Sequence, residues 1–182
     1  MSNTSIAVYP AAVGQQCVDY FRSQRPEWSV VLNAEKFVTG VNVFIQENEA
    51  ATAIWLRFPL SEDWELYSGI SNRLKCCWLN VLFQEHIVWE YNLYDEANVL
   101  IDRFEPLPGM WGHETGSPGN AEIVARIWKI NPAKINRYLK MWTDRLRRRS
   151  RKAYFCRDEY GYGQLEQGYD FIKALTGLKF PD

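Results

Sequence analysis

Few side chains in this sequence are of types that could carry out a reaction, and they lie near one loop. The only 2 histidines are His86 and His113, and their spacing matches no His-rich metal-binding motif. His113 and Glu114 follow Asp102 and Arg103 after a stretch rich in proline and glycine. An imidazole beside a carboxylate can transfer protons, and an arginine can hold an anionic group. One hypothesis is therefore an enzyme of unknown reaction with a loop site around Asp102, His113 and Glu114, aided by Arg103.

The 4 cysteines add neither a zinc pattern nor a redox CxxC motif; they are Cys17, Cys76, Cys77 and Cys156. The N-terminal segment has no basic head and no long apolar stretch, so we expect no signal peptide. Because a protein without a signal peptide stays in the cytoplasm, we expect a cytoplasmic location and four reduced cysteine thiols. The sequence also has no phosphate-binding loop, nucleophile elbow or kinase motif. We therefore expect no metal and no cofactor.

The strongest charge feature is a basic segment in the C-terminal third of the chain. Residues 121–152 contain 11 basic and 2 acidic residues, whereas the remainder contains 10 basic and 20 acidic residues. Such a segment can bind phosphates, an acidic protein or the acidic remainder of its own chain. Cations are also stabilised at the C-terminus of a helix by its dipole. The densest part of the segment comprises Arg145, Arg147, Arg148, Arg149, Arg151 and Lys152.

These observations favour a binding function over a catalytic one. We expect a non-enzymatic binding or interaction protein, with an immunity or regulatory role against a charged protein partner as one version. Its surface would combine the loop at residues 102–114, including Arg103 and Trp111, with the basic segment. The alternatives are the loop enzyme described above and a nucleic-acid-binding protein that uses the basic helix end. An aromatic-rich edge strand could also support a homodimer.

Composition limits the class of protein. The chain has 182 residues, the length of one domain, and 47% of them are hydrophobic. That proportion is sufficient for a packed core, in which we expect most of the 8 tryptophans to be buried. No apolar run approaches the roughly 18 residues that a membrane helix needs, so we expect no membrane partner.

Three consecutive apolar runs predict three neighbouring strands at residues 76–83, 87–94 and 99–104. In the middle run, Trp89, Tyr91 and Leu93 alternate with Glu90 and Asn92, which predicts a core face and a more polar face. Earlier strands are predicted at residues 5–9, 28–33, 36–46 and 52–58, and earlier helices at 11–24 and 64–74.

Three more helices are predicted in the C-terminal part. The first is a short helix capped by Asn120 or Ser117. A longer, basic helix is expected to begin at Pro132 and to reach Leu146. The last helix, at residues 164–176, would end at Gly177. The order of elements predicts an α+β fold, with a mostly antiparallel sheet of about six to seven strands and C-terminal helices on one face. We expect one domain over residues 1–182, sheet-rich over 1–111 and helical over 118–182.

One pattern resembles a known group of sequences. Residues 89–94 (WEYNLY), 100–104 (LIDRF) and 107–111 (LPGMW) are followed later by Asp158, Glu159 and the apolar helix that ends at Leu178. This is similar to a loose group of small uncharacterised bacterial α+β proteins with a YxLYxxxxxxIDRFxxLPG-type core. The resemblance spans roughly residues 76–180 and implies a bacterial cytoplasmic setting, but no activity and no catalytic residue. Asn98 stands near the position at which that group tends to have a turn glycine, and this difference implies a longer hairpin here.

Overall fold

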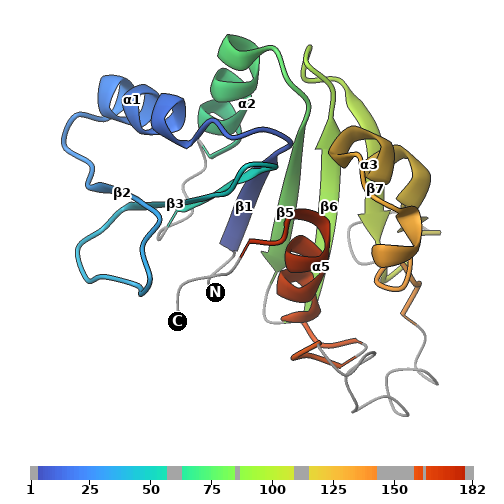
Figure 1. Ribbon diagram of the computed structural model, residues 1–182. Helices are drawn as coiled ribbons and strands as arrows, with labels where there is room; N and C mark the ends of the chain where they lie inside the picture. The colour runs from blue at the N-terminus through green and yellow to red at the C-terminus, as the bar shows by residue number, and fades with distance from the viewer. Residues whose placement is uncertain are drawn as a thin grey trace.

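The protein is built around one sheet of eight strands with helices on both of its faces (Figure 1). The computed structural model describes residues 4–56, 63–84, 87–108, 115–142, 158–161 and 163–178. The strands lie in the order β2-β3-β4-β1-β5-β6-β7-β8. Every neighbouring pair is antiparallel except β2 and β3, which are parallel.

Along the chain, α1 follows β1 and α2 follows β4, and strands β5 to β8 precede the helices of the C-terminal part. The strands are β1 (Thr4–Tyr9), β2 (Val30–Leu32), β3 (Val43–Glu47), β4 (Thr52–Leu56), β5 (Trp78–Gln84), β6 (Val88–Tyr94), β7 (Leu100–Glu105) and β8 (Ser117–Pro118). The helices are α1 (Gly14–Gln24), α2 (Asp63–Leu74), α3 (Ala121–Trp128), the short 3-10 helix η1 (Pro132–Lys134) and α5 (Gln167–Thr176).

The predicted α+β class is confirmed, and the sheet has one strand more than the predicted maximum. Each of the seven predicted strands has a counterpart, although the strand expected at residues 36–46 begins only at Val43. The additional strand, β8, has two residues and pairs with the end of β7. Its sequence is Ser-Pro within a proline- and glycine-rich stretch, and proline in a sheet is confined to positions such as an edge strand. Strand periodicity cannot reveal so short an element.

Two apolar layers enclose the sheet. The side chains of Trp89 and Tyr91 lie on the face that α3, η1 and α5 cover. There the ring of Phe171 in α5 stacks on both, with centroids 5.1 Å and 5.6 Å away. Helices α1 and α2 cover the opposite face, where Tyr9 and Trp78 are fully buried. The C-terminal helices therefore pack on one face, as predicted, and the two N-terminal helices cover the other.

Tryptophan is used mainly as a core residue. Among the described tryptophans, Trp28 is half-buried and Trp64 is exposed. The buried ones are Trp55, Trp78, Trp89, Trp128 and Trp142. The prediction of buried indoles is thus confirmed for most of those that the structure describes. Within the same residues, no helix has the length and hydropathy that crossing a bilayer requires.

The helix predicted from Pro132 is wrong over its described part. Only η1 is helical, and turns follow it, although Ile135, Tyr138 and Trp142 are buried as their spacing suggested. Successive turns are closed mostly by bonds between residues three apart, as in the bond from the Tyr138 N–H to the Ile135 carbonyl. The Trp142 N–H then donates to the carbonyl of Pro106, at 2.8 Å, and so joins this segment to the chain that follows β7. An α-helix would direct that N–H to its own preceding turn.

Candidate functional site

Asp102 and Arg103 are neighbours in β7, but their side chains lie on opposite faces of the sheet. Asp102 pairs with Leu93 and Arg103 with Asn92, so each follows the alternation of β6. The Asp102 carboxylate accepts a hydrogen bond of 2.6 Å from the Tyr91 hydroxyl on the face that α3 and α5 cover. Arg103 forms a 3.1 Å ion pair with a buried carboxylate, that of Glu105. These two charges, which the sequence places side by side, therefore do not point into one site.

The contacts of Asp102 give it a structural role. The same carboxylate oxygen accepts the backbone N–H of Asn120 at 2.9 Å, and Asn120 is the residue that caps α3. Asp102 therefore connects β6 and β7 to the beginning of that helix. Burial, followed by the adjacent Asp102 charge, raises the pKa of Tyr91 far above its usual range. The tyrosine therefore keeps its proton and acts as a hydrogen-bond donor.

Most of the predicted site residues lie outside the described part of the chain. In the loop these are Trp111, His113 and Glu114. In the basic segment they are Arg145, Arg147, Arg148, Arg149, Arg151 and Lys152.

The face that carries Arg103 has a row of buried polar groups across three strands. Asn80 in β5, Glu90 in β6 and Glu105 in β7 are all buried. The Glu90 carboxylate accepts a hydrogen bond from the Gln84 amide, and Glu105 is paired with Arg103. Each carboxylate thus already has a donor from a neighbouring residue, as buried charges require. The alternation of Glu90 and Asn92 in the sequence indicated this polar face, but not its burial.

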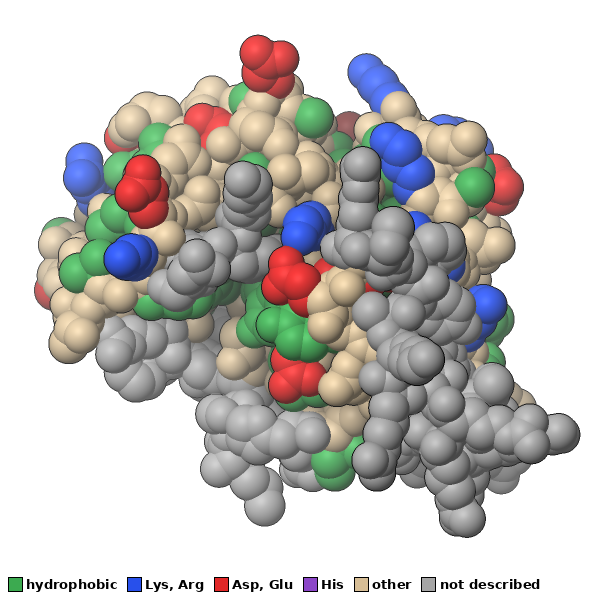
Figure 2. Space-filling view, turned by 60° about the horizontal axis from the view of Figure 1, so that its bottom comes forward, with side chains coloured by type: hydrophobic (Ala, Val, Ile, Leu, Met, Phe, Trp, Pro, Cys, Tyr) green, Lys and Arg blue, Asp and Glu red, His purple; other side chains and the backbone are tan. Residues whose placement is uncertain are grey.

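The described part of the basic segment, residues 121–142, forms an exposed, positively charged surface. Residues 121–142 contain 5 basic side chains and one acidic side chain, Glu122. Figure 2 shows Lys and Arg side chains gathered on the right, where Figure 1 places α3 and η1. We call this region the basic surface; it comprises Arg126, Lys129, Lys134, Arg137 and Lys140, of which only Arg137 is half-buried.

The members of the basic surface differ in their local partners. The Arg137 guanidinium lies 3.1 Å from the Asp158 carboxylate and 4.8 Å from the centre of the Tyr138 ring. The Tyr138 hydroxyl also donates to Asp158, at 2.9 Å, and burial raises the pKa of this tyrosine. By contrast, Arg126, Lys129 and Lys134 form no ion pair with a residue that the structure describes. The charge of Arg137 is thus partly balanced within the protein, whereas the other three charges face solvent.

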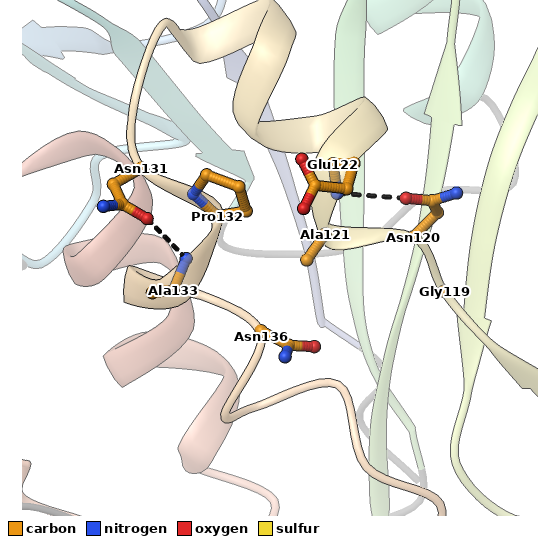
Figure 3. A pocket seen from close by; sticks show the side chains of 8 residues that line it. All are labelled: Gly119, Asn120, Ala121, Glu122, Asn131, Pro132, Ala133 and Asn136. Atoms are coloured by element: carbon orange, nitrogen blue, oxygen red, sulfur yellow. Dashed lines mark hydrogen bonds between the residues drawn. The ribbon is translucent and has the colours of Figure 1, made fainter.

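A polar pocket of 460 Å³ lies next to the basic surface, between the beginning of α3 and η1 (Figure 3). The side-chain oxygens of Asn120 and Asn131 cap the two helices by accepting backbone N–H groups. Asn136 and Glu122 complete its polar lining. The pocket can form hydrogen bonds, but Glu122 is its only lining residue with an ionisable side chain. It therefore lacks the paired groups that acid–base chemistry needs.

The described thiols are poorly suited to catalysis. Cys17, Cys76 and Cys77 are free, and burial raises the pKa of Cys17 to about 12 and that of Cys76 to about 11. A thiol with so high a pKa holds almost no thiolate at neutral pH, and the thiolate is the nucleophile. Nor do the described residues include a group of three or more side chains arranged to hold a metal ion.

An apolar run at the beginning of β7 is exposed, and the sequence did not indicate this exposure. Val99, Leu100 and Ile101 are exposed by 57%, 46% and 39% of their surface. The sequence predicts a strand here but not its exposure, because hydropathy shows that a segment is apolar but not where it lies in the sheet.

No protein-family model, curated protein or solved structure matches this chain.

Proposed function

We propose that the protein is a non-enzymatic binding protein whose basic surface docks an acidic protein partner. The observation that carries this proposal is the set of three exposed cations, Arg126, Lys129 and Lys134, that form no ion pair with described residues. Clustered like charges repel one another within the fold, so they favour an external partner of opposite charge. An immunity or regulatory role against such a partner is one version of this function. The free thiols of Cys17 and Cys76 fit a reducing, cytoplasmic location.

Charge distribution favours a protein over a nucleic acid as the partner. Helix α3 has 8 residues and is therefore only about 12 Å long. A nucleic acid is a continuous polyanion, and outside residues 121–152 the chain has 20 acidic and 10 basic residues, which oppose its binding beyond the basic segment. A protein can present a compact acidic patch of matching size. The separation of Asp102 from Arg103 also weighs against the loop enzyme.

Charge reversal on the basic surface tests the proposal. The variant combines Arg126→Glu, Lys129→Glu and Lys134→Glu, and the assay is capture of protein from a lysate of the native host, identified by mass spectrometry. We expect capture of an acidic protein to fall by at least about tenfold, because attraction at three positions becomes repulsion.

The matched control carries Arg22→Glu, Lys36→Glu and Arg73→Glu, three exposed positions outside the basic surface. It changes the net charge by the same amount and should retain the partner. Nuclease treatment of the lysate separates the two partner classes. Equal capture by both triple variants would refute the proposal, and capture lost on nuclease treatment would identify nucleic acid as the partner instead.

A further inference from the structure

An exposed group of apolar side chains lies where the start of α2 meets the turn between β6 and β7. The Trp64 indole, 45% exposed, contacts the Tyr94 ring edge-on, with centroids 6.3 Å apart. Leu100 pairs with Tyr94 across β6 and β7, and the exposed Val99 precedes it. Figure 1 shows α2 and this turn at the same end of the sheet. We call these four side chains the apolar patch; an exposed indole is a frequent anchor at protein interfaces.

Hydrogen bonds hold α2 against this turn and so fix the position of the patch. The side-chain amide of Asn98, in the turn, donates to the Ser68 carbonyl at 3.4 Å and to the Asn72 side-chain oxygen at 2.9 Å. Trp64 lies one helical turn before Ser68, and Glu65 lies two turns before Asn72. Both therefore lie on the side of α2 that faces the turn.

Carboxylates border the apolar patch. The Asp95 carboxylate accepts the backbone N–H of Val99 at 2.8 Å, so its charge lies beside the exposed part of the patch. Glu96 is the next residue of the turn, and Glu65 follows Trp64 in α2; both glutamates are exposed. None of these three carboxylates forms an ion pair with a residue that the structure describes. The border of the patch is therefore negatively charged.

The described cations on this side of the molecule do not neutralise that border. Arg73 lies in the last turn of α2, nine residues from Trp64 and so about 13 Å along the helix axis. Lys75 lies beyond the end of the same helix. On the β7 side, Arg103 is already paired with Glu105. The negative charge at the patch is therefore available to a partner.

Together these features specify a cationic, partly apolar occupant. An arginine guanidinium can lie over the face of Trp64 and donate hydrogen bonds to a neighbouring carboxylate. Apolar side chains beside that arginine would cover Val99 and Leu100 and remove their surface from water. The phosphates of a nucleic acid or of an anionic membrane would be repelled by the same carboxylates.

A second copy of the chain is a less suitable occupant. Its basic surface would have to meet the apolar patch in a head-to-tail contact. Such a contact leaves one patch and one basic surface unoccupied in every pair, so it continues from copy to copy into a ring or a filament. Sedimentation of the protein detects such species directly.

We propose that the apolar patch docks an arginine-containing, partly apolar segment of a basic protein partner. The inference goes beyond the proposed function, which concerns an acidic partner on the basic surface. A chain with both surfaces can bring two proteins of opposite charge together.

Three short fluorescent peptides test this docking on the full chain. The first alternates arginine and leucine, the second replaces each arginine by glutamate, and the third replaces each leucine by serine. We expect the arginine–leucine peptide to bind, as measured by fluorescence anisotropy. The glutamate peptide should show no binding, because the carboxylates repel it. The serine peptide should bind at least about tenfold more weakly, because it cannot cover the apolar side chains.

Variants of the border test whether the peptide binds at this place. Glu65→Lys with Glu96→Lys should weaken the arginine–leucine peptide by at least about tenfold, because attraction becomes repulsion. The matched control, Glu27→Lys with Glu35→Lys, makes the same change of charge at exposed positions elsewhere and should bind normally. Asp95 is left unchanged because its carboxylate holds the turn.

The indole itself is tested in two ways. Trp64→Ala should weaken the same peptide by at least about tenfold, whereas Phe37→Ala, at another exposed aromatic residue, should not. The indole N–H signal that disappears from the NMR spectrum of Trp64→Phe belongs to Trp64. In the original protein this signal should shift when the arginine–leucine peptide is added, so the test does not depend on a folded alanine variant.

Four results would overturn the inference. Equal weakening by the two double variants would indicate general attraction to an acidic chain, and normal binding by Trp64→Ala with an unshifted indole signal would exclude the patch. In sedimentation, species heavier than the 21.3 kDa chain that disappear with Glu65→Lys and Glu96→Lys would identify a second copy as the occupant. Binding to phosphatidylcholine vesicles that is lost with Trp64→Ala would assign the patch to a membrane. The proposed function survives each of these results, because charge reversal at Arg126, Lys129 and Lys134 tests it separately.

Discussion

The indole N–H of Trp78 donates a hydrogen bond of 2.7 Å to the side-chain oxygen of Asn98. Trp78 is fully buried at the start of β5, and Asn98 lies in the turn between β6 and β7. The backbone of Asn98 is left-handed, with a φ of 61°. Asparagine tolerates that conformation and also supplies the acceptor, whereas glycine could supply only the conformation. The turn thus also provides an acceptor for a core tryptophan.

Two substitutions at Asn98 should separate these contributions. Asn98→Gly leaves the buried Trp78 N–H without its acceptor, and should lower the free energy of unfolding by about 1–3 kcal/mol. Asn98→Ala loses the same acceptor and adds about 1–2 kcal/mol of backbone strain. Urea denaturation of both variants measures the difference. An alanine variant as stable as the glycine variant would contradict the assignment of strain to this position.

Removal of the Tyr91 hydroxyl should weaken the attachment of α3 to the sheet. Tyr91→Phe leaves Asp102 with one fewer donor, which should cost about 1–2 kcal/mol of unfolding free energy. Asp102→Asn should also destabilise, and the double variant should cost less than the sum of the two, because both changes remove one interaction. Denaturant titrations of the four proteins give the coupling energy.

The same variants test the structural role of Asp102. Neither Tyr91→Phe nor Asp102→Asn should change partner capture at a temperature where both are folded. Loss of capture by Asp102→Asn with unaltered stability would place this carboxylate in the binding site and revive the loop hypothesis.

Asp170 in α5 should make stability fall as the pH rises. Its carboxylate accepts the N–H groups of Glu159 and Tyr160, but burial dominates and raises the pKa of the carboxyl. The folded state therefore binds this proton more tightly than the unfolded state does. The resulting stabilisation is complete below the unfolded pKa and is lost as the pH passes through the folded pKa.

Asp170→Asn removes this titration. The free energy of unfolding of this variant minus that of the original protein should increase as the pH rises from about 4 to 7, because only the original protein loses the stabilisation from the bound proton. Urea denaturation at each pH measures this difference. Asp19→Asn, at an exposed carboxylate of α1, controls for the loss of one negative charge. A pH-independent difference between the Asp170 variant and the original protein would contradict the raised pKa.

Gly168 permits the close approach of α5 to the sheet. A Cβ at this position would lie 2.7 Å from Cε1 of Phe83 and 3.1 Å from Cγ of Trp89. Gly168→Ala should therefore cost about 1–3 kcal/mol through overpacking, despite the gain of about 1 kcal/mol in helix propensity. Phe83→Leu should partly rescue the alanine variant by removing the ring atoms in contact, and thermal unfolding of the single and double variants shows whether it does. Additive effects would argue that the contact with Phe83 is not the cause.

Alternation and capping made much of this fold predictable from the sequence. Trp89, Tyr91 and Leu93 identified the core face of β6, and Asn120 and Gly177 mark helix ends as predicted. These features are local, so hydropathy and backbone preference specify them. The helix expected after Asn131 is absent beyond η1 in the described residues, where turns and the long-range bond from Trp142 to Pro106 replace helical bonding; a pattern of local spacing cannot indicate that long-range bond.

The candidate site was less predictable because it depends on the order of the strands. The sequence places Asp102 beside Arg103, but only the covering layers show that one charge anchors α3 and the other pairs with Glu105. The same limit applies to Leu100 and Ile101, whose exposure follows from the position of β7 near an edge. An apolar run has the same composition at the centre of a sheet as it has at its margin.

The central place of β1, between β4 and β5, has a consequence during synthesis. A ribosome completes β1 before either of its neighbours: β4 is complete about 47 residues later and β5 about 75 residues later, so the two sides of this apolar strand lack their partners until then. The hairpin of β3 and β4 and the meander of β5 to β7 need only nearby residues and can form without it. Joining these two pieces through β1 is therefore the step at which a nascent chain is most exposed to misassembly with its neighbours.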